Sequence, residues 1–256
     1  MVIQHTKFNL KTLNNILLMV IFFFVTSCAP NILNSAHHPK AKDESSFLFY
    51  SSEDYVKTNE IYEKLFFPVK GLSLPDRKNL LPNAQRKYRN GIHRGIDIIA
   101  SYNTPVYATF DGIIIYENDS YQDVGLDLYN IFLEKTNQLK RTPSDLYNHI
   151  LLGKHIIIDH GYDFLPKYRT TSIYAHLSQI DQNIKVGLKV KKGELIGYVG
   201  NSGTKYGAMN NTLGAHLHWE VHFENEKNKY YLGENIESED FINTFKKIIE
   251  ENKNEN

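Results

Sequence analysis

The sequence predicts a mainly β protein with a helical insertion and a C-terminal helix. Apolar and polar side chains alternate over residues 216–221, which is the pattern of a strand with one packed face and one polar face. Three consecutive isoleucines at 156–158 indicate a well-buried strand. Short segments rich in Val, Leu and Ile between residues 182 and 198 are separated by turns at Gly187 and Gly193.

The composition limits the number of domains and the classes of partner. The chain has 256 residues, of which 41% are hydrophobic and 12% aromatic, and this is enough for one sizeable core. Its 29 basic and 29 acidic residues give a formal net charge of zero, which argues against a nucleic-acid partner. Cys28 is the sole cysteine, so no disulfide can form within the chain.

Residues 1–27 have the organisation of a secretory signal peptide. Lys7 and Lys11 precede an apolar run at 16–25, which is too short to span a bilayer because spanning takes about 20 residues. Residues 25–28 resemble a bacterial lipobox, which implies that Cys28 becomes the lipidated first residue of the mature protein. The alternative is an ordinary signal peptide in which Cys28 is incidental.

Residues 28–46 are expected to form the lipidated N-terminus and a flexible tether, because Pro, Asn, Ser and mixed charges dominate this stretch. The anchor predicts a location in the cell envelope, attached to a membrane and facing the periplasm or the cell wall. His37 and His38 either bind metal or are inert, solvated side chains of the tether.

Residues 47–92 are predicted to form an N-terminal segment that packs on the main domain. A helix is expected around residues 59–66, and Pro68 ends it. The stretch before His93 also carries five basic side chains, which either meet an acidic substrate or belong to a solvated loop: Arg77, Lys78, Arg86, Lys87 and Arg89.

Residues 106–108 and 112–116 are predicted to pair as strands around a turn at 111–112. Residues 117–153 form the expected helical insertion, with an apolar stripe from Leu126 and a second helix that starts with Thr142 as N-cap and Pro143 at the first helical position. The two helices either wall a substrate groove or lie remote from the site.

Two more strands are expected at 155–160 and 172–177. A loop at 201–214, rich in Gly and Asn, is suited to a flexible rim that contacts substrate. Residues 226–256 are assigned to a C-terminal helix and tail, because Ser238 can cap a helix with an apolar stripe that includes Phe241 and Phe245.

Histidine and carboxylate side chains gather at the two ends of the predicted domain. His216 and His218 share one face of their strand, since positions i and i+2 project to the same side. The Cα atoms of His93 and Asp97 would lie about 13 Å apart in a straight strand, whereas zinc bonds of about 2 Å require two donor atoms to lie only a few ångströms from each other. The backbone must therefore curl between them, and Gly95 permits this.

These motifs resemble those of the lysostaphin-type (LytM, M23) zinc metallopeptidases, which cut peptidoglycan peptides. A His-x-His motif alone would be a weak signal, but the order and number of the matching blocks make the resemblance specific. It implies an antiparallel sheet or sandwich of the lysostaphin-like type over residues 93–225, with the insertion at 117–153. The matching blocks are 93–98, 104–108, 111–114, 158–161, 174–178, 190–197 and 216–220.

The resemblance also implies a function for each polar residue. It assigns His93, Asp97 and His218 as ligands of one Zn²⁺ ion, and it assigns catalytic roles to His176 and His216. Three protein ligands with an open position are typical of a catalytic zinc site. The implied activity is a zinc endopeptidase that hydrolyses peptide bonds in peptidoglycan from a lipid anchor; the bond cut and the division of labour between the two catalytic histidines stay open.

Two other functions match parts of the pattern. A non-catalytic LytM-like protein would bind the wall or activate a separate amidase, but such proteins typically lack one or more ligands. A biotinyl- or lipoyl-carrier hairpin would fit residues 190–197, but no lysine lies at a suitable tight turn.

The remaining polar residues near these motifs are given structural roles. Glu220 is expected to contact a ligand or a neighbouring strand, and His222 is expected to be exposed beyond the metal. Local hydrogen bonds are expected for three histidines and turn formation for two aspartates: His149, His155, His160, Asp111 and Asp159.

Overall fold

The computed structural model describes residues 47–51, 55–57 and 65–253. The predictions of a signal peptide, a lipidated Cys28, a tether and a helix near residues 59–66 concern residues that lie outside this part or largely outside it. No helix among the described residues has both the length and the apolar character needed to cross a membrane.

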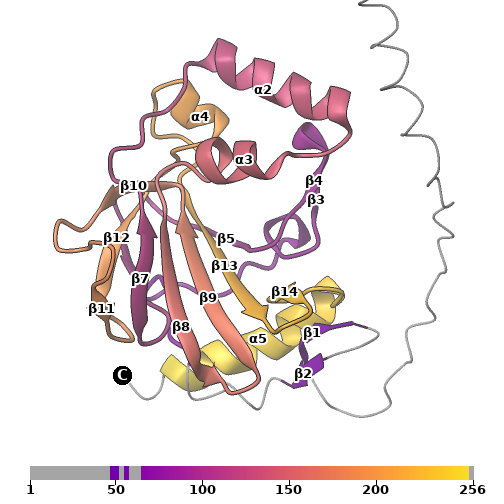
Figure 1. The fold of residues 1–256 in the computed structure, drawn as a ribbon, viewed down its shortest axis with the longest axis vertical. Helices are drawn as coiled ribbons and strands as arrows, with labels where there is room; N and C mark the ends of the chain where they lie inside the picture. Colours follow the sequence, from indigo (N-terminus) through magenta and orange to yellow (C-terminus); the bar gives the residue numbers. More distant parts are fainter. Residues whose placement is uncertain (1–46, 52–54, 58–64, 254–256) are drawn as a thin grey trace, which may run out of the picture. The chain divides into compact units, whose positions relative to one another are not determined.

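Strands dominate the described chain, as the sequence predicts (Figure 1). The elements in chain order are β1 (Phe47–Tyr50), β2 (Tyr55–Lys57), the 3-10 turn η3 (Lys78–Leu80), β3 (Gln85–Arg86), the 3-10 turn η4 (Lys87–Arg89), β4 (Gly91–Ile92), β5 (Ile96–Ile99), β6 (Pro105–Tyr107), β7 (Gly112–Glu117), α2 (Leu126–Leu139), α3 (Ser144–Leu146), the π-helical turn η5 (Tyr147–Leu151), β8 (Ile156–Leu165), β9 (Tyr168–Ala175), β10 (Leu177–Ile180), β11 (Lys189–Val190), β12 (Leu195–Val199), α4 (Lys205–Ala208), β13 (His216–Glu224), β14 (Lys229–Tyr231) and α5 (Ser238–Lys253).

The strands pair antiparallel throughout, which confirms the predicted fold class. The largest sheet has the order β11-β7-β8-β9-β13-β14, and β5 is an additional partner of β13. A second sheet has the order β10-β12-β6. Two short ribbons, β1-β2 and β3-β4, complete the described strands.

Strand β13 lies inside the largest sheet and pairs along both of its edges. Its first half runs antiparallel to β5, with His218 opposite Asp97, and the other edge pairs with β9, with His218 opposite Ala175. Beyond β5, the same strand pairs with β14 through residues 222–224. A strand held on both edges has little freedom to slip, because a shift of one residue would turn every side chain to the other face.

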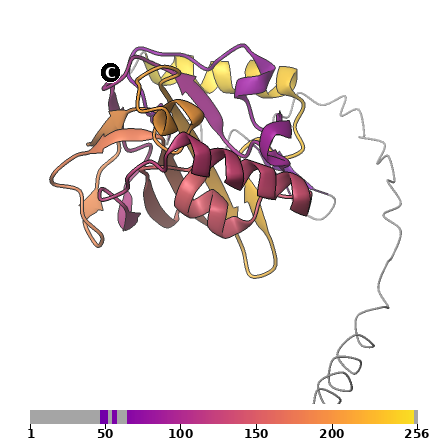
Figure 2. The ribbon, with the colours of Figure 1, turned by 90° about the horizontal axis from the view of Figure 1, so that it is seen from above.

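The odd-numbered side chains of β13 form part of the hydrophobic core, as the alternation predicts. Leu217 and Trp219 are 0% and 1% exposed, and the ring of Phe67 packs edge-on against Trp219. Phe241 of helix α5 is buried in the same core cluster. Helix α5 therefore covers the core face of the sheet, while α2 and α3 lie on the opposite side (Figure 2).

The predicted pairing of 106–108 with 112–116 is wrong, although both strands exist. Strand β6 pairs with β12 and β7 pairs with β8 and β11, so the two lie in different sheets. The segment between them joins the 191–194 turn: Ala108 exchanges backbone hydrogen bonds with Gly193 and Glu194, and Asp111 accepts from Lys192 N over 2.8 Å. Asp111 thus forms a turn with a distant segment instead of closing a hairpin.

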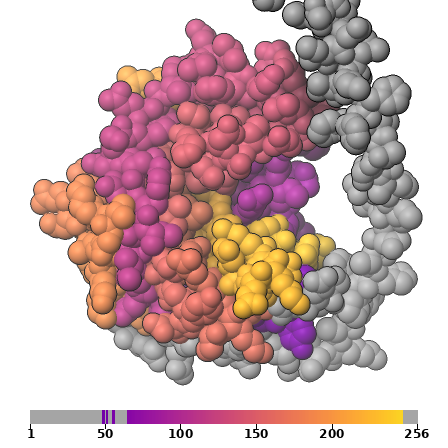
Figure 3. Space-filling view, viewed as in Figure 1, coloured from indigo at the N-terminus to yellow at the C-terminus, as the bar shows by residue number. Residues whose placement is uncertain are grey.

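The insertion contains two helical segments, as predicted, but the second starts differently. Pro143 occupies the N-cap position with extended backbone, and no side chain caps the helix. The hydroxyl of Thr142, which was expected to cap it, donates instead to the carbonyl of Arg89 over 2.5 Å. Thr142 therefore joins the insertion to the turn η4, which precedes the first histidine motif. Figure 3 shows the pink insertion packed against this purple segment.

A buried polar chain crosses the core beside this sheet. His160 is 3% exposed; its Nδ1 donates to the carbonyl of Asp111 over 2.8 Å, and its Nε2 lies 2.7 Å from Ser172 Oγ. Tyr174 continues the chain, with its hydroxyl 3.0 Å from Ser172 Oγ. Burial lowers the pKa of His160 below its usual 6.5, so the folded protein holds this imidazole neutral.

The neutral His160 makes folding sensitive to acid. A histidine with a lowered pKa stabilises the fold above its unfolded pKa of about 6.5, and that stability is lost as the pH falls, because the unfolded chain binds the proton more readily. We expect the free energy of unfolding to be smaller at pH 5 than at pH 7. Replacement His160→Asn, which keeps a donor near the Nδ1 position, should reduce this difference in denaturant titrations; an unchanged difference would contradict the assignment.

Candidate metal centre

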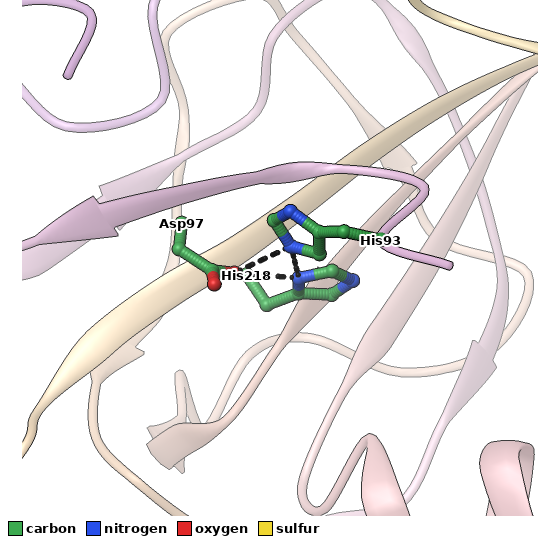
Figure 4. A group of neighbouring side chains, drawn as sticks. All are labelled: His93, Asp97 and His218. Carbon is green, nitrogen blue, oxygen red and sulfur yellow. Dashed lines mark hydrogen bonds and ion pairs between the residues drawn. The ribbon is translucent and has the colours of Figure 1, made fainter. Parts of the chain in front are cut away.

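Two imidazoles and one carboxylate converge at one point, as the sequence predicts (Figure 4). His93 Nε2 lies 2.8 Å from Asp97 Oδ1 and 3.0 Å from His218 Nδ1, and the distance from His218 Nδ1 to Asp97 Oδ1 is 2.8 Å. Their exposed fractions are 1%, 8% and 4%. This is the one group of such side chains in the described part of the chain that could hold a metal ion.

Local backbone structure brings His93 and Asp97 together although four positions separate them. The amide of His93 donates to the carbonyl of Ala84 over 2.9 Å, which extends the β3-β4 ribbon, and Asp97 lies in β5 against β13. The chain turns between them at Gly95, where an added Cβ would lie 2.4 Å from the backbone oxygen of Trp219. The need for glycine is thus the close approach of β13, since Gly95 does not have a positive φ.

The donor set fits a divalent cation. His93 Nδ1 donates to the carbonyl of Leu81 over 2.8 Å, and His218 Nε2 donates to Glu220 Oε1 over 2.7 Å. In the neutral imidazoles, the two nitrogens that face Asp97 therefore carry lone pairs. Three lone-pair donors at mutual distances of 3.0 Å or less need a positive charge among them, and nitrogen with oxygen donors suits zinc.

Arg86 holds the second oxygen of the ligand carboxylate. Its Nη2 donates to Asp97 Oδ2 over 2.8 Å and its Nη1 donates to the carbonyl of Asn79 over 2.8 Å, so Asp97 Oδ1 alone faces the histidines. Burial acts to raise the pKa of Asp97, but His93 and the hydrogen bond from His218 hold that pKa well below its usual range. The sequence does not indicate this role of Arg86, because Arg86 belongs to a basic run and no known motif relates its position to that of Asp97.

Glu220 and Tyr147 contact His218 at Nε2, the ring nitrogen that faces away from Asp97. Tyr147 of η5 donates a hydrogen bond to Glu220 Oε1, and its hydroxyl lies 3.2 Å from His218 Nε2. His222 donates to Glu220 Oε2 over 2.5 Å. The prediction that His222 is exposed is wrong: it is 6% exposed, and it lies between its strand partners Thr171 of β9 and Tyr231 of β14.

The buried charges favour a cation at the metal position. Burial acts to lower the pKa of His218, but the hydrogen bonds that its ring donates to the carboxylates of Asp97 and Glu220 raise this pKa to about 9. Burial acts to raise the pKa of Glu220, yet its bonds with His218 and His222 hold it well below 4.5. A metal ion bound by His218 would therefore displace a proton, which makes metal affinity increase with pH.

His176 and His216 complete the site. His176 Nδ1 donates to the carbonyl of Ser202 over 2.7 Å, and His216 Nδ1 donates to the carbonyl of Gly214 over 2.7 Å. Their rings are 4.7 Å apart between centroids, and His176 lies 5.6 Å from His218 by the same measure. The predicted strand 172–177 is interrupted here, because His176 has a φ of 60° between β9 and β10.

A pocket of about 690 Å³ opens onto all five residues. One wall is formed by the η4 segment and the insertion, including Arg89, Tyr129 and Tyr147, and the other includes Lys205 and Tyr206 of α4. The insertion therefore lines the site, which settles the choice left open by the sequence. Arg89 is 6% exposed and its guanidinium lies over the ring of Tyr147. The alternative that the basic side chains before His93 belong to a solvated loop is therefore wrong for Arg89.

The contact of Tyr147 with the ligand network generates a prediction. Tyr147→Phe removes the hydroxyl that donates to Glu220 and lies beside His218, while the ring and its stacking on Arg89 stay in place. Partners of metal ligands typically contribute about ten- to a hundredfold in metal affinity. We expect the dissociation constant for zinc to rise by about that factor, measured by competition with a chelator.

Tyr129→Phe is the matched control, because Tyr129 lines the same pocket and has no hydrogen bond to the ligand network. It should bind zinc as the unaltered chain does. Equal zinc affinity in both variants would contradict the role given to the Tyr147 hydroxyl.

Comparison of the sequence with known proteins finds a family model and several relatives that match it. The model of peptidase family M23 matches residues 143–230, a range that contains His176, His216 and His218 and starts after His93 and Asp97. The peptidoglycan DD-endopeptidase ShyA of Vibrio cholerae is 25% identical over 188 residues, 71% of this chain and 33% of that protein. An uncharacterized metalloprotease of Haemophilus influenzae is 31% identical over 130 residues, 51% of this chain and 18% of the relative.

The chain thus spans a third or less of the length of these curated relatives. Among solved structures, a zinc containing peptidase from Vibrio cholerae has 22% identity and a TM-score of 0.40, covering 63% of this chain and 37% of that one. The catalytic domain of lysostaphin from Staphylococcus simulans has 22% identity and a TM-score of 0.33, covering 63% and 80%. The sequence matches identify a peptidase family M23 domain in this chain.

Proposed function

We propose that this protein is a zinc-dependent endopeptidase that hydrolyses peptide bonds in peptidoglycan. The observation that carries the proposal is the convergence of His93, Asp97 and His218 on one point, with His176 and His216 beside them in the same pocket. The name of the relative ShyA, a peptidoglycan DD-endopeptidase, supports the choice of peptidoglycan as the substrate.

Zinc is proposed as the metal, held by His93 Nε2, Asp97 Oδ1 and His218 Nδ1. When bound, zinc acidifies a water molecule and polarises the carbonyl of the scissile bond. The surrounding chain prepares the ligands for it: Leu81 and Glu220 accept the outer N–H groups of the two imidazoles. Arg86 keeps the carboxylate turned so that Oδ1 faces the site.

His176 and His216 supply the acid–base and electrostatic chemistry. Each ring donates its Nδ1–H to a backbone carbonyl, so each Nε2 is the nitrogen available to the pocket. Burial and the neighbouring histidines lower the pKa of His176 well below 6.5, so this ring is neutral and able to accept a proton at neutral pH. Between them, the two rings orient or deprotonate the attacking water and stabilise the oxyanion or protonate the leaving amine.

A non-catalytic protein that binds the wall or activates an amidase is the competing function. Such a protein has no need for three converging ligands, two further imidazoles with fixed Nδ1 partners and an open pocket. All of these are retained here. The complete set therefore favours the enzyme.

The two groups of histidines should respond differently to substitution. Asp97→Ala or His218→Ala should abolish both zinc binding and cleavage of wall peptides, because each removes a ligand. His176→Ala or His216→Ala should keep zinc near one ion per chain and lower kcat by about a hundredfold or more, in line with the loss of a general acid or base. Zinc content by elemental analysis and cleavage by mass spectrometry of wall fragments would measure both.

Treatment with a chelator should stop cleavage and zinc should restore it. Cleavage that persists without metal would rule out the metal mechanism, and equal loss of zinc in all four variants would contradict the division of roles.

We also propose that the protein acts in the cell envelope from a lipid on Cys28, facing the periplasm or the cell wall. The support is the sequence alone: a basic start, a short apolar run and the sole cysteine directly after it. Durable attachment would need more than one acyl chain.

The anchor has its own test in cell fractionation. The unaltered chain should be found with membranes, and Cys28→Ala should be released in soluble form or retained by an uncleaved signal peptide of higher mass. A Cys28→Ala variant that is processed and still associates with membranes in the same amount would contradict the lipid anchor.

A further inference from the structure

One peptide group joins the insertion to the catalytic histidine His176. The carbonyl of Ser202 accepts the hydrogen bond from His176 Nδ1 over 2.7 Å. The amide of Gly203 belongs to the same peptide group and donates to Asp123 Oδ1 over 2.6 Å. A carboxylate, a peptide N–H, its C=O and an imidazole N–H thus follow one another in a single hydrogen-bonded line.

We propose that Asp123 is a positioning residue for His176, the carboxylate of a carboxylate–histidine pair that is bridged by a peptide group. The proposal rests on the catalytic role proposed for His176. In the serine hydrolases, an aspartate that accepts directly from Nδ1–H holds the catalytic imidazole in the correct tautomer and orientation. Here the 202–203 peptide group transmits the same influence.

The physical basis is polarisation along the line. A hydrogen bond from a peptide N–H to a carboxylate is charge-assisted and stronger than a neutral one. Hydrogen bonds in a chain polarise one another, so the negative charge of Asp123 makes the carbonyl of Ser202 a better acceptor. A better acceptor at Nδ1 keeps the proton there and leaves the lone pair of His176 on Nε2, toward the pocket.

The carboxylate of Asp123 has few other polar contacts among the described residues. No lysine, arginine or histidine in the described part of the chain lies within ion-pair distance of its carboxylate, and its other hydrogen bond is a long one of 3.4 Å from the hydroxyl of Tyr121. An added Cβ at Gly207 would lie 2.8 Å from Asp123 Oδ1. Asp123 is an exposed residue, and its carboxylate lies close to the loop on the side that faces Gly207.

The peptide group itself cannot move freely. An added Cβ at Gly153 would lie 2.3 Å from the carbonyl of Ser202, and one at Gly203 would lie 2.4 Å from Gly153 N, so the two chain segments touch through their backbones. Ser202 Oγ accepts from Lys154 N and donates to the carbonyl of Leu177, each over 2.8 Å. A bridge of this rigidity can pass orientation from Asp123 to the imidazole.

His176 needs such support because its own backbone is strained. It has a φ of 60°, in the left-handed region that is unfavourable for residues with a side chain. Its amide donates to the carbonyl of Leu152 over 3.0 Å, at the end of the insertion. The insertion therefore holds His176 twice, through Leu152 and through Asp123.

Two substitutions separate the charge of Asp123 from its shape. Asp123→Asn keeps an oxygen that can accept from Gly203 N but removes the negative charge, and Asp123→Ala removes both. Asp127→Asn is the matched control, because Asp127 is an exposed carboxylate in the first turn of α2 of the same insertion. Each variant would be made in the full chain.

Three quantities are measured: the zinc content, kcat and KM on wall peptides, and the ring N–H signals in NMR spectra of ¹⁵N-histidine-labelled protein. The signal of His176 Nδ1–H is assigned by its loss in His176→Gln. We expect kcat to fall about ten- to a hundredfold in Asp123→Ala, as for other partners of active-site groups, and by a smaller factor in Asp123→Asn. Zinc content and KM should stay as in the unaltered chain.

The NMR signal is the reading that a purely structural role would not change. His176 Nδ1–H should move upfield and exchange faster with water in both Asp123 variants, and it should be unchanged in Asp127→Asn. An unchanged signal together with an unchanged kcat in Asp123→Asn would overturn the proposal, even if Asp123→Ala failed to fold. If the unaltered chain cleaved no wall peptide, the proposed function would fail, and the NMR comparison would still decide the role of Asp123.

Discussion

The antiparallel pairing of β13 with β5 is the constraint on which the site depends. It sets His218 opposite Asp97, so that a ligand from residue 218 meets one from residue 97 across a single ladder position. The close approach of the β13 backbone to Gly95 then brings His93 to the same point. Since β9 pairs with the other edge of β13, the register of β13 is fixed on both sides. His176 follows β9 directly, and its ring therefore lies near that of His218.

The same strand is buried on both faces for different reasons. Its odd-numbered side chains lie in the apolar core, where burial is favourable. On the other face, His218, Glu220 and His222 are polar and also buried, and such burial is costly unless each polar group has a partner. Glu220 satisfies this requirement, because His218, His222 and Tyr147 all bond to it. Through Tyr147, the insertion is thus part of the candidate metal centre and lines its pocket.

Much of the site could be predicted from the sequence, because its residues stand in short motifs whose spacing reflects backbone geometry. The shared face of His216 and His218, the glycine between His93 and Asp97, and the β strands follow from periodicities of two and from turn residues. Arg86, Tyr147 and Asp123 could not be found in this way, because their roles depend on contacts between segments far apart in the chain. The wrong partners of β6 and β7 have the same cause: Asp111 bonds to Lys191 and Lys192 instead of closing a local hairpin.

X-ray absorption at the zinc edge of the purified, zinc-loaded chain is the most direct test of the metal centre. We expect nitrogen and oxygen ligands at about 2.0–2.2 Å from zinc, namely two imidazole nitrogens, one carboxylate oxygen and one solvent oxygen, together with scattering from the more distant atoms of two imidazole rings. The spectrum of Asp97→Ala should differ or be absent. A spectrum that shows four histidine ligands, or a purified chain that binds no zinc, would contradict the site described for His93, Asp97 and His218.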